Sequence, residues 1–546
     1  MSDGTPINTA HASSVAAPAL SVPTGGSNAR WCSAFWLALL FCSGLKVYLA
    51  NHLAPFVDEA FYWQESRQLA WSYSDVPALM AWLIRASETV FGHSTLAMRA
   101  PFLLLGAGIP LLMVSLVGDM AGARVGWQAG LWTLALPLLG TLGVLALPDV
   151  PLTFASMLAL WALQRATTRD RWYDWGWLGL ALAIAWLSHY RAAVLLVSGL
   201  AFFALSARGR RFMTLPGLWL ALALSCLGLL PLWLFNQQHE WAGLSFQLRD
   251  RHPWSFHADA LVQPLEQALV VTPFLYALLL LVLFVALRRR QRGAPWDLMG
   301  LAAVVPLLGY FLVGLFADGE RFRVHWPITG YLPLIAVLPL LIQERSSTGS
   351  RLWRWWPPLA AIGGALGGAL VLAYLLLASQ PSMSSQLSTS KLFPSGFVGW
   401  NEAAAMLDRA RAQAPVDSLV VADNFILAAQ LDFAAGTDAP LYVLDSPLNH
   451  KHGRAAQLAM WARDESALRQ QAGANVLLVV DETALRARQR PAWLQSLCGR
   501  VSDLVPIERI DLYEGRKRMA VYSGRVAGTS HASSICSYPP AAVVRE

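Results

Sequence analysis

Long apolar runs recur along this chain, and they constrain its fold more than any other feature. A helix needs about 20 apolar residues to cross the hydrocarbon core of a bilayer. Such runs predict about eleven spans, at 31–51, 94–117, 127–145, 149–165, 175–188, 191–206, 214–235, 265–287, 298–316, 326–343 and 355–378. Only 14% of residues are charged, against roughly 25% in soluble domains. We therefore predict a polytopic α-helical membrane protein.

Arginine is unevenly distributed over the predicted loops, and this predicts the orientation in the membrane. Basic residues concentrate in alternate loops, at 166–174, 207–213, 288–297 and 344–354. Because basic loops stay on the cytoplasmic side, the N-terminus is predicted to be cytoplasmic. An odd number of spans then predicts that the C-terminal part lies outside the cytoplasm. The net charge of +7 is explained by this topology, so no nucleic-acid partner is expected.

The composition divides the chain into four predicted parts. Residues 1–30 form a disordered cytoplasmic tail, 31–378 a transmembrane domain, 379–525 a small domain and 526–546 a second disordered tail. In the small domain, short apolar runs at 419–422, 441–444, 476–480 and 518–522 are separated by helical patterns, which is typical of an α/β domain. Cys498 and Cys536 both follow the last span and could pair if that side is oxidising. The sequence leaves this pairing open.

The segment 57–79 follows the first span directly and is rich in acidic residues. Apolar side chains at Trp63, Leu69 and Trp71 predict that 59–72 is a helix on the membrane surface, and 77–91 has a similar pattern. Carboxylates beside a bilayer are costly and usually have a function or a partner. We therefore interpret this segment as the centre of an active site.

Each acidic residue allows two interpretations. Asp58 and Glu59 suit the first turn of a helix, but they also suit a general base or an electrostatic partner. Asp75 and Asp149 share the spelling Asp-Val-Pro, which favours a helix start. The topology nevertheless puts both on the side of Asp58, where carboxylates could bind sugar hydroxyls or a divalent cation. Asp75 and His239 are a candidate pair of metal ligands, although His239 could simply pair with its neighbour Glu240.

A second group of candidate residues is basic and lies on the same predicted side. Arginines there could anchor helix ends, or they could bind a phosphate, which guanidinium groups match bidentately. The candidates are His189, Arg191, Arg251, Arg321, Arg323 and His325. The sequence has no P-loop or dinucleotide glycine motif, so nucleotide-driven chemistry is not expected.

These motifs, in this order, resemble bacterial lipid-linked-sugar glycosyltransferases, the relatives of protein O-mannosyltransferases and the lipid A aminoarabinose transferase. The matching residues are an Asp-Glu pair after the first span, Asp75, Pro77, Leu79, Phe91, Gly92, 147–152, 187–190, 236–241, 324–327 and 422–424. The resemblance covers nearly the whole chain. Its motifs are short, and they are specific only in combination.

The resemblance implies a GT-C architecture, with juxtamembrane helices in the first outer loop and a periplasmic C-terminal domain in the bacterial inner membrane. It implies a polyprenyl-phosphate sugar donor, inversion at the anomeric carbon, and a lipid A, core oligosaccharide, other glycan or protein acceptor. By position, Asp58 would be the catalytic carboxylate and Asp149 a second site residue. Tyr62, in the aromatic-rich helix after Asp58, is included as a substrate contact.

Two positions depart from the family pattern. Relatives commonly read Asp-Lys-Pro-Pro or Glu-Lys-Pro-Pro, whereas this chain has Val76 and Ala78. His189 stands where many relatives have lysine. Either nearby arginines supply the charge for the donor phosphate, or the donor is held differently, or activity has been lost.

Three functions follow from these observations. The first is an inverting glycosyltransferase, with arginines that stabilise the phosphate leaving group and Asp58 as general base. The second is a transporter or flippase for a lipid-linked or anionic solute, although transporters tend to place ionisable groups near the midplane. The third is a non-catalytic scaffold of envelope assembly. Only the first predicts covalent transfer of a sugar.

Overall fold

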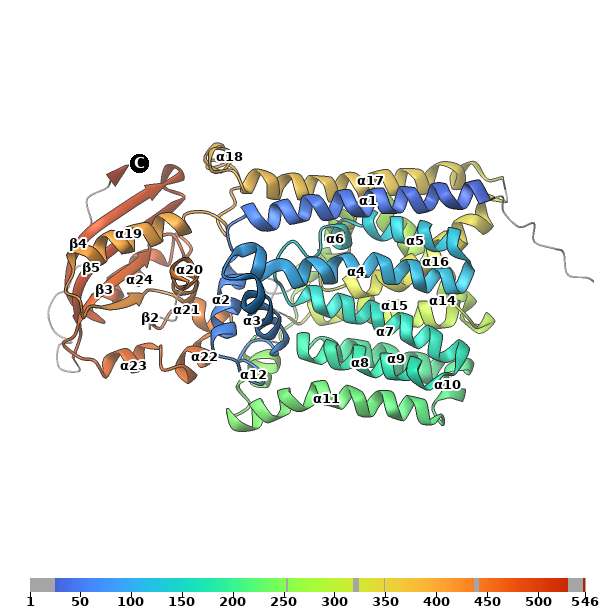
Figure 1. The fold of residues 1–546 in the computed structure, drawn as a ribbon, viewed down its shortest axis with the longest axis horizontal. Coiled ribbons are helices and arrows are strands. Elements are labelled where there is room, and N and C mark those ends of the chain that lie inside the picture. The colour runs from blue at the N-terminus through green and yellow to red at the C-terminus, as the bar shows by residue number, and fades with distance from the viewer. Residues whose placement is uncertain are drawn as a thin grey trace, which may run out of the picture.

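The fold was analysed in a computed structural model, which describes residues 25–251, 254–317, 324–347, 349–436, 441–528 and 544–545. A long helical bundle occupies one end of the molecule, and a sheet with its own helices occupies the other (Figure 1). Two of the candidate phosphate-binding residues, Arg321 and Arg323, lie outside the described residues, as does Cys536. The question of whether Cys498 and Cys536 pair therefore stays open.

The bundle contains most of the helices in the chain. Its elements are α1 (Gly25–His52), α4 (Thr95–Ala121), α5 (Ala123–Ala135), α6 (Pro137–Gly140), α7 (Asp149–Arg169), α8 (Trp172–Ser188), α9 (Ala192–Leu205), α10 (Ala207–Phe212), α11 (Pro216–Gln238), α12 (Ala242–Ser245), η1 (Phe246–Asp250), η2 (Ala258–Val262), α13 (Gln263–Val271), α14 (Pro273–Arg289), η3 (Arg290–Arg292), α15 (Trp296–Gly314), α16 (Ile328–Ser346) and α17 (Arg351–Ala378). The short helix α18 (Pro381–Gln386) follows. Every predicted span coincides with one or two of these helices.

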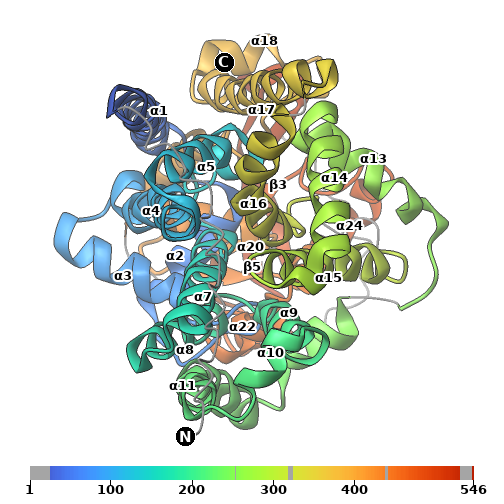
Figure 2. The same cartoon turned by 90° about the vertical axis from the view of Figure 1, so that its right-hand side faces the viewer.

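Fewer than the eleven predicted spans meet the criteria of helix length and apolar composition. Within the described residues, five helices are long and apolar enough to cross a membrane, namely α1, α4, α11, α15 and α17. The pair Ala258–Val271 and Pro273–Arg292, bent by 114°, would make a sixth. The other predicted spans are helices that are shorter or less apolar. Among them, α16 runs through the middle of the bundle (Figure 2) and is buried on nearly all sides.

The sheet domain, defined as α19 to β6, confirms the predicted α/β class. Its elements are α19 (Trp400–Gln413), β1 (Leu419–Ala422), α20 (Phe425–Ala435), β2 (Leu441–Val443), α21 (Pro447–Lys451), α22 (Ala455–Met460), α23 (Glu465–Arg469), β3 (Asn475–Asp481), α24 (Arg490–Leu497), β4 (Val501–Leu512), η4 (Tyr513–Gly515), β5 (Lys517–Val526) and β6 (Val544–Arg545). The strand order is β2-β1-β3-β5-β4-β6. Strands β1, β2 and β3 pair in parallel, while β5 is antiparallel to β3 and β4.

Two sequence predictions differ from the structure. Strand β4 was not predicted, because Pro506 and the irregular pairing near it break the alternation of apolar residues. The helix predicted on the membrane surface is instead buried. In α2 (Val57–Arg67), every residue from Glu59 to Ser66 is buried, since α3 (Leu79–Phe91) and α20 cover it. Trp63 packs edge-on against Phe433 of α20, with their ring centroids 5.4 Å apart.

One hydrophobic core joins the first outer loop to the sheet domain. It contains Phe61 and Met80 from the loop helices together with Phe425 and Val479 from the sheet domain. Burying such side chains is worth roughly 1.5–3 kcal/mol each. This shared core fixes the sheet domain over the acidic segment, so residues from both ends of the chain can meet there.

Candidate active site

Three carboxylates from the acidic segment surround one arginine from the sheet domain. Arg454 Nη2 lies 3.4 Å from Asp58 Oδ1, and Arg454 Nη1 lies 3.5 Å from Glu65 Oε1. The closest partner of Arg454 is Asp75, through Oδ2. Glu65 and Asp75 are buried, whereas 26% of the Asp58 side chain is exposed. We call these four residues the Arg454 cluster, and Asp58 is the carboxylate in it that a substrate can reach.

The Arg454 guanidinium is held among aromatic rings. Its Cζ lies 4.2 Å from the ring centroid of Phe61, 5.0 Å from that of Tyr62 and 5.6 Å from that of Phe425. Such cation–π contacts strengthen when they are removed from water. Tyr62, predicted as a substrate contact, is itself buried and packs beside this guanidinium.

The loop that carries Arg454 docks on the acidic segment through polar contacts. Ser74 Oγ donates to the Gly453 carbonyl at 2.6 Å, and Gln457 Oε1 accepts from Ser74 N at 3.0 Å. Gly453 has a φ of +74°, and a Cβ there would lie 2.6 Å from Phe246 Cε1. Glycine is therefore required for this close approach. The sheet domain thus supplies a positioned cation to the site.

The cluster contains three carboxyl groups for one guanidinium, and the protonation state of Glu65 reduces this imbalance. Burial, followed by the negative charge of Asp75, raises the pKa of Glu65 well above its usual value. The protonated form of Glu65 is favoured further because it can donate a hydrogen bond to the neighbouring Asp75 carboxylate, which also raises the pKa of Glu65. A neutral Glu65 leaves Arg454 to balance Asp58 and Asp75, the second of which it contacts most closely.

This protonation state predicts a pH-dependent effect of the variant E65Q. Below the ordinary glutamate pKa of about 4.3, Glu65 is protonated in both the folded and the unfolded state. Above it, the folded state holds the proton more tightly, so wild-type stability falls as pH rises. Gln removes this decline. The unfolding temperature of E65Q relative to wild type is therefore expected to rise from pH 5 to pH 8 in detergent.

The matched control for this experiment is D408N, because Asp408 is exposed on α19. Its unfolding temperature relative to wild type is expected to stay nearly constant over the same range. An E65Q difference that is constant, or that shrinks as pH rises, would show that Glu65 is ionised in the folded protein.

Glu59, predicted as catalytic together with Asp58, is held inside the protein. Its carboxylate accepts two bonds from Arg99, Nε to Oε1 at 2.8 Å and Nη2 to Oε2 at 2.6 Å. It also accepts from the backbone N–H groups of Phe56 and Ala146, at 2.8 and 2.6 Å. Both oxygens are thus used, and neither residue of the ion pair is exposed. The ion pair between Glu59 and Arg99 connects α2 to α4. Of the two neighbouring acids Asp58 and Glu59, only Asp58 is therefore accessible.

A second charged cluster is built at the starts of α7, α9 and α16 and directly after η1. Arg191 Nη2 lies 2.6 Å from Asp149 Oδ1, and His325 Nε2 lies 3.3 Å from Asp149 Oδ2. The guanidinium carbons of Arg191 and Arg251 lie 5.3 and 5.2 Å from the ring centroid of Trp326. We call these five residues the Asp149 cluster. It brings the guanidinium groups of Arg191 and Arg251 to one site, and such groups suit an anionic ligand.

The two clusters are connected through Gln247 of η1. Its Nε2 donates to the Asp75 carbonyl at 2.7 Å, and its Oε1 accepts from Arg251 Nη1 at 3.1 Å. His189 lies beside the Asp149 cluster and accepts from the Arg191 backbone N–H through Nδ1 at 3.1 Å. Burial, and then the charges of Arg191 and Arg251, lower the pKa of His189 well below its usual value. It is therefore a neutral residue here and does not replace the charge of a lysine.

An apolar cavity of about 440 Å³ lies between helices that include α7, α9 and α16, whose starts carry the Asp149 cluster. It is lined by Ser156 of α7, Leu195 of α9 and Leu332 of α16. Ser156 follows Asp149 by seven residues, about 10 Å along a helix. The cavity therefore lies one to two helical turns deeper in the bundle than the charges. An amphiphile with an anionic head and an apolar tail fits this arrangement.

Asp75 and His239, the predicted pair of metal ligands, each have other partners among the described residues. Within the described part of the chain, no group of three or more His, Cys, Asp or Glu side chains could hold a metal ion. Asp75 pairs with Arg454, and the His239 ring packs edge-on against Phe235 with centroids 4.5 Å apart. The acid-capping interpretation of Asp75 also fails, because α3 begins only at Leu79.

Several site residues were missed in the sequence. The sequence around Arg454, at 453–461, shows only a helical pattern, and Trp326 belongs to a short motif in front of a span. Glu65 is one of several acidic residues in the segment 57–79, and nothing in its neighbours distinguishes it. Two features of the sequence point weakly to Arg454. It follows a glycine, Gly453, next to a helical pattern, and it belongs to the domain that is predicted to lie on the same side of the membrane as Asp58.

Comparison with known proteins supports the same architecture. Residues 75–235, which include Asp75, Asp149 and Arg191 but not Asp58 or Arg454, match the family model described as dolichyl-phosphate-mannose-protein mannosyltransferase. Lipid A galacturonosyltransferase RgtD from Rhizobium johnstonii is 26% identical over 304 residues. That match covers 54% of this chain and 62% of the relative, so it spans less than two thirds of that protein.

Two solved structures of ArnT from Cupriavidus metallidurans share the fold. The structure bound to undecaprenyl phosphate has a TM-score of 0.61 at 14% identity, covering 90% of this chain and 98% of ArnT. The apo structure has a TM-score of 0.62 at 15% identity, covering 91% and 98%. At this identity the likeness establishes the fold. The chain therefore has the GT-C membrane fold of ArnT over nearly its whole length and resembles GT-C glycosyltransferases in sequence, as its motifs predicted.

Proposed function

We propose that this protein is an inverting glycosyltransferase that moves a sugar from a polyprenyl-phosphate donor to an envelope acceptor. The observation that carries the proposal is the connection of an accessible acid, Asp58, through the Arg454 cluster and Gln247 to the Asp149 cluster, which lies next to the apolar cavity. The named relative acts on lipid A, and the named structure binds undecaprenyl phosphate. A lipid A or core-oligosaccharide acceptor is therefore the first to test.

In the proposed reaction, the donor phosphate binds the Asp149 cluster and its isoprenoid tail enters the cavity below. The acceptor hydroxyl approaches from the side of Asp58, which takes its proton as the oxygen attacks the anomeric carbon. The bond between that carbon and the phosphate oxygen breaks, and Arg191 and Arg251 stabilise the charge left on the phosphate. The polyprenyl phosphate then leaves toward the membrane.

The orientation is also a proposal, and the arginine distribution supports it. Basic residues cluster at the end of the bundle that lies away from the sheet domain (Figure 1), in α10, in η3 and at the start of α17. By the positive-inside rule this end faces the cytoplasm. The two charged clusters and the sheet domain would then face the periplasm of the bacterial inner membrane.

Transport is the main alternative, and the position of the charges argues against it. Both clusters lie at helix starts or in loops at one end of the bundle, whereas transporters bind near the midplane. The deciding experiment incubates the purified protein with a polyprenyl-phosphate sugar and candidate acceptors, and follows product masses. A glycosylated acceptor is expected. Movement of intact donor across vesicles without any covalent product would support a flippase instead.

The role of the Asp149 cluster predicts a selective effect of R251Q. Loss of a charged hydrogen bond costs about 1.5–3 kcal/mol, so the KM for the lipid donor is expected to rise about 10–100-fold. The KM for the acceptor is expected to stay near the wild-type value. The matched control is R249Q, an exposed arginine on the same turn η1, with normal KM values. Equal changes in both KM values for R251Q would place Arg251 outside the donor site.

A further inference from the structure

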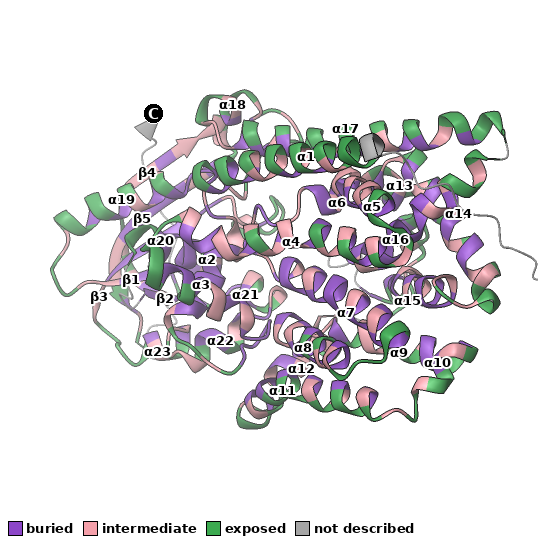
Figure 3. Cartoon of the chain, turned by 45° about the vertical axis from the view of Figure 1, so that its right-hand side comes forward, coloured by how far each residue is buried: buried purple, intermediate pink, exposed green. Residues whose placement is uncertain are grey.

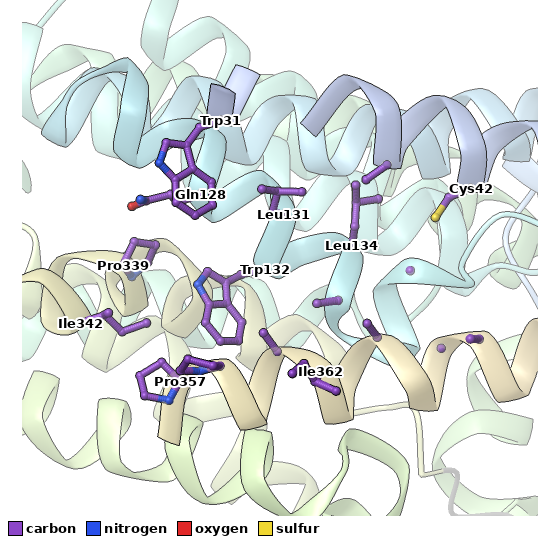
Figure 4. A pocket seen from close by; sticks show the side chains of 18 of the residues that line it. Trp31, Cys42, Gln128, Leu131, Trp132, Leu134, Pro339, Ile342, Pro357 and Ile362 are labelled. Atoms are coloured by element: carbon purple, nitrogen blue, oxygen red, sulfur yellow. The ribbon is translucent and has the colours of Figure 1, made fainter. Parts of the chain in front are cut away.

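A second apolar cavity runs along the outside of the bundle, away from the candidate active site. It is a groove of about 1450 Å³ between α1 and α17, with α5 as its floor (Figure 4). Trp31, Phe41, Leu131, Trp132 and Ile362 line it. The volume exceeds the roughly 300–1,000 Å³ of a typical small-molecule site, so a long, chain-like ligand is favoured.

The two helices that flank the groove present apolar side chains that no described part of the protein covers. Figure 3 shows exposed positions along the outer surfaces of α1 and α17. Phe41 is 74% exposed and Leu370 is 71% exposed. In a membrane protein such surfaces face lipid tails. The groove is therefore open to the hydrocarbon of the bilayer.

One end of the groove is polar and basic. Arg124 in the first turn of α5 and Arg354 in the first turn of α17 both line it and are exposed. Two further polar residues also line the groove, and Gln343 Nε2 donates to Gln128 Oε1 at 3.3 Å. Among the described residues, neither arginine has an acidic partner within ion-pair distance. This end lies at the start of α1 and α17, opposite the sheet domain (Figure 1).

We propose that this groove binds an anionic phospholipid, with its head-group phosphate on Arg124 and Arg354 and its acyl chains between α1 and α17. Guanidinium groups match phosphate oxygens, and basic pockets between spanning helices bind anionic head groups. The site is separate from the donor site, because the arginines of the two sites lie at opposite ends of the bundle. A bound lipid would brace α1, which leads directly into α2 and Asp58.

A partner helix is the competing occupant, and the charges disfavour it. A helix in the groove would bring its own end against Arg124 and Arg354, and it would need acidic groups there to balance them. A phospholipid supplies the negative charge and the apolar chains in one molecule. The groove extends from Trp31 and Arg354 to Leu372 and Leu376 of α17, about 33 Å along that helix. One leaflet is about half of the roughly 30 Å hydrocarbon core, so the phospholipid occupies the half of the groove next to the two arginines.

The test is native mass spectrometry of the full-length purified protein, titrated with phosphatidylglycerol or with phosphatidylcholine of the same acyl chains. Wild type is expected to retain phosphatidylglycerol more tightly. The double variant R124Q/R354Q is expected to weaken that binding about 30-fold, equivalent to about 2 kcal/mol. The matched control R290Q/R292Q removes two exposed arginines of η3 that do not line the groove, and it is expected to bind like wild type.

A second pair of variants tests the apolar part of the groove. Ala365 lines it, so A365W is expected to reduce retention of both lipids, whereas L370W on the exposed outer surface of α17 leaves retention unchanged. Equal binding of the two lipids together with no effect of R124Q/R354Q would overturn the proposal. So would a dimer or a bound protein that A365W releases. None of these readouts depends on sugar transfer, so failure here leaves the proposed function untouched.

Discussion

The variant D58N is expected to lower the turnover rate with a hydroxyl acceptor by about 10²–10⁴-fold, the usual contribution of a general base. Asn keeps the shape of Asp58 and its contact with Arg454 but cannot accept a proton. The loss is expected equally in kcat and in kcat/KM, because a base acts only in the transition state. Initial rates measured with purified protein and a polyprenyl-phosphate sugar would test this expectation.

The matched control is E240Q, which neutralises an exposed acid just after α11 and is expected to transfer sugar at the normal rate. The unfolding temperature of D58N is expected to stay close to that of wild type, since Asp58 is partly exposed. Transfer by D58N within tenfold of wild type would remove Asp58 from the role of base. That result would instead fit an acceptor phosphate, which needs no deprotonation.

The variant R454Q is expected to destabilise the protein by about 3–5 kcal/mol, the cost of breaking a buried ion pair. Without the guanidinium, the carboxylate of Asp75 is left buried without its cation, and the sheet domain loses its ion pairs with the acidic segment around Arg454. Sugar transfer is expected to fall as well, because Asp58 loses its positioning partner. Thermal unfolding in detergent, followed by tryptophan fluorescence, measures the stability.

The double variant R454Q/D75N separates charge balance from packing. Asn at position 75 removes the uncompensated charge, so the double variant is expected to recover at least about half of the stability that R454Q lost. Transfer activity is not expected to recover, since Asp58 still lacks Arg454. If the double variant were as unstable as the sum of the single variants, the pairing of Arg454 with Asp75 would not be the source of the effect.

Much of the fold was predictable from local patterns. Apolar runs set the positions of the bundle helices, because each helix in a bilayer must present apolar side chains over its length. The α/β class of the sheet domain followed from its alternating short runs. Asp58, Asp75 and Asp149 were correctly predicted to lie near one end of the bundle, since topology alone places loops on one side.

The contacts within the site were not predictable in the same way. Arg454 is separated from Asp75 by 379 positions and from Asp58 by 396. Neither segment contains a local pattern that predicts contact with the other. Burial of α2 was missed for the same reason, because its amphipathic pattern fits a membrane surface as well as the surface of α20. Asp58 and Glu59 are neighbours with the same chemistry, yet Glu59 is buried against Arg99, whereas the side chain of Asp58 is partly exposed beside Arg454.

The sequence by itself determined that the chain is a membrane-embedded helical protein with an acidic first loop, basic loops at the other end and an α/β C-terminal part. These properties depend on composition and on short-range periodicity, which each segment carries alone. Only the tertiary structure decided which charges meet. It brings Arg454 into contact with Asp58 and Asp75 and buries Glu65 so that its neutral form is favoured. It also places the Asp149 cluster next to the apolar cavity. Ion pairs depend on the distance and burial of groups far apart in the chain, and packing alone sets both.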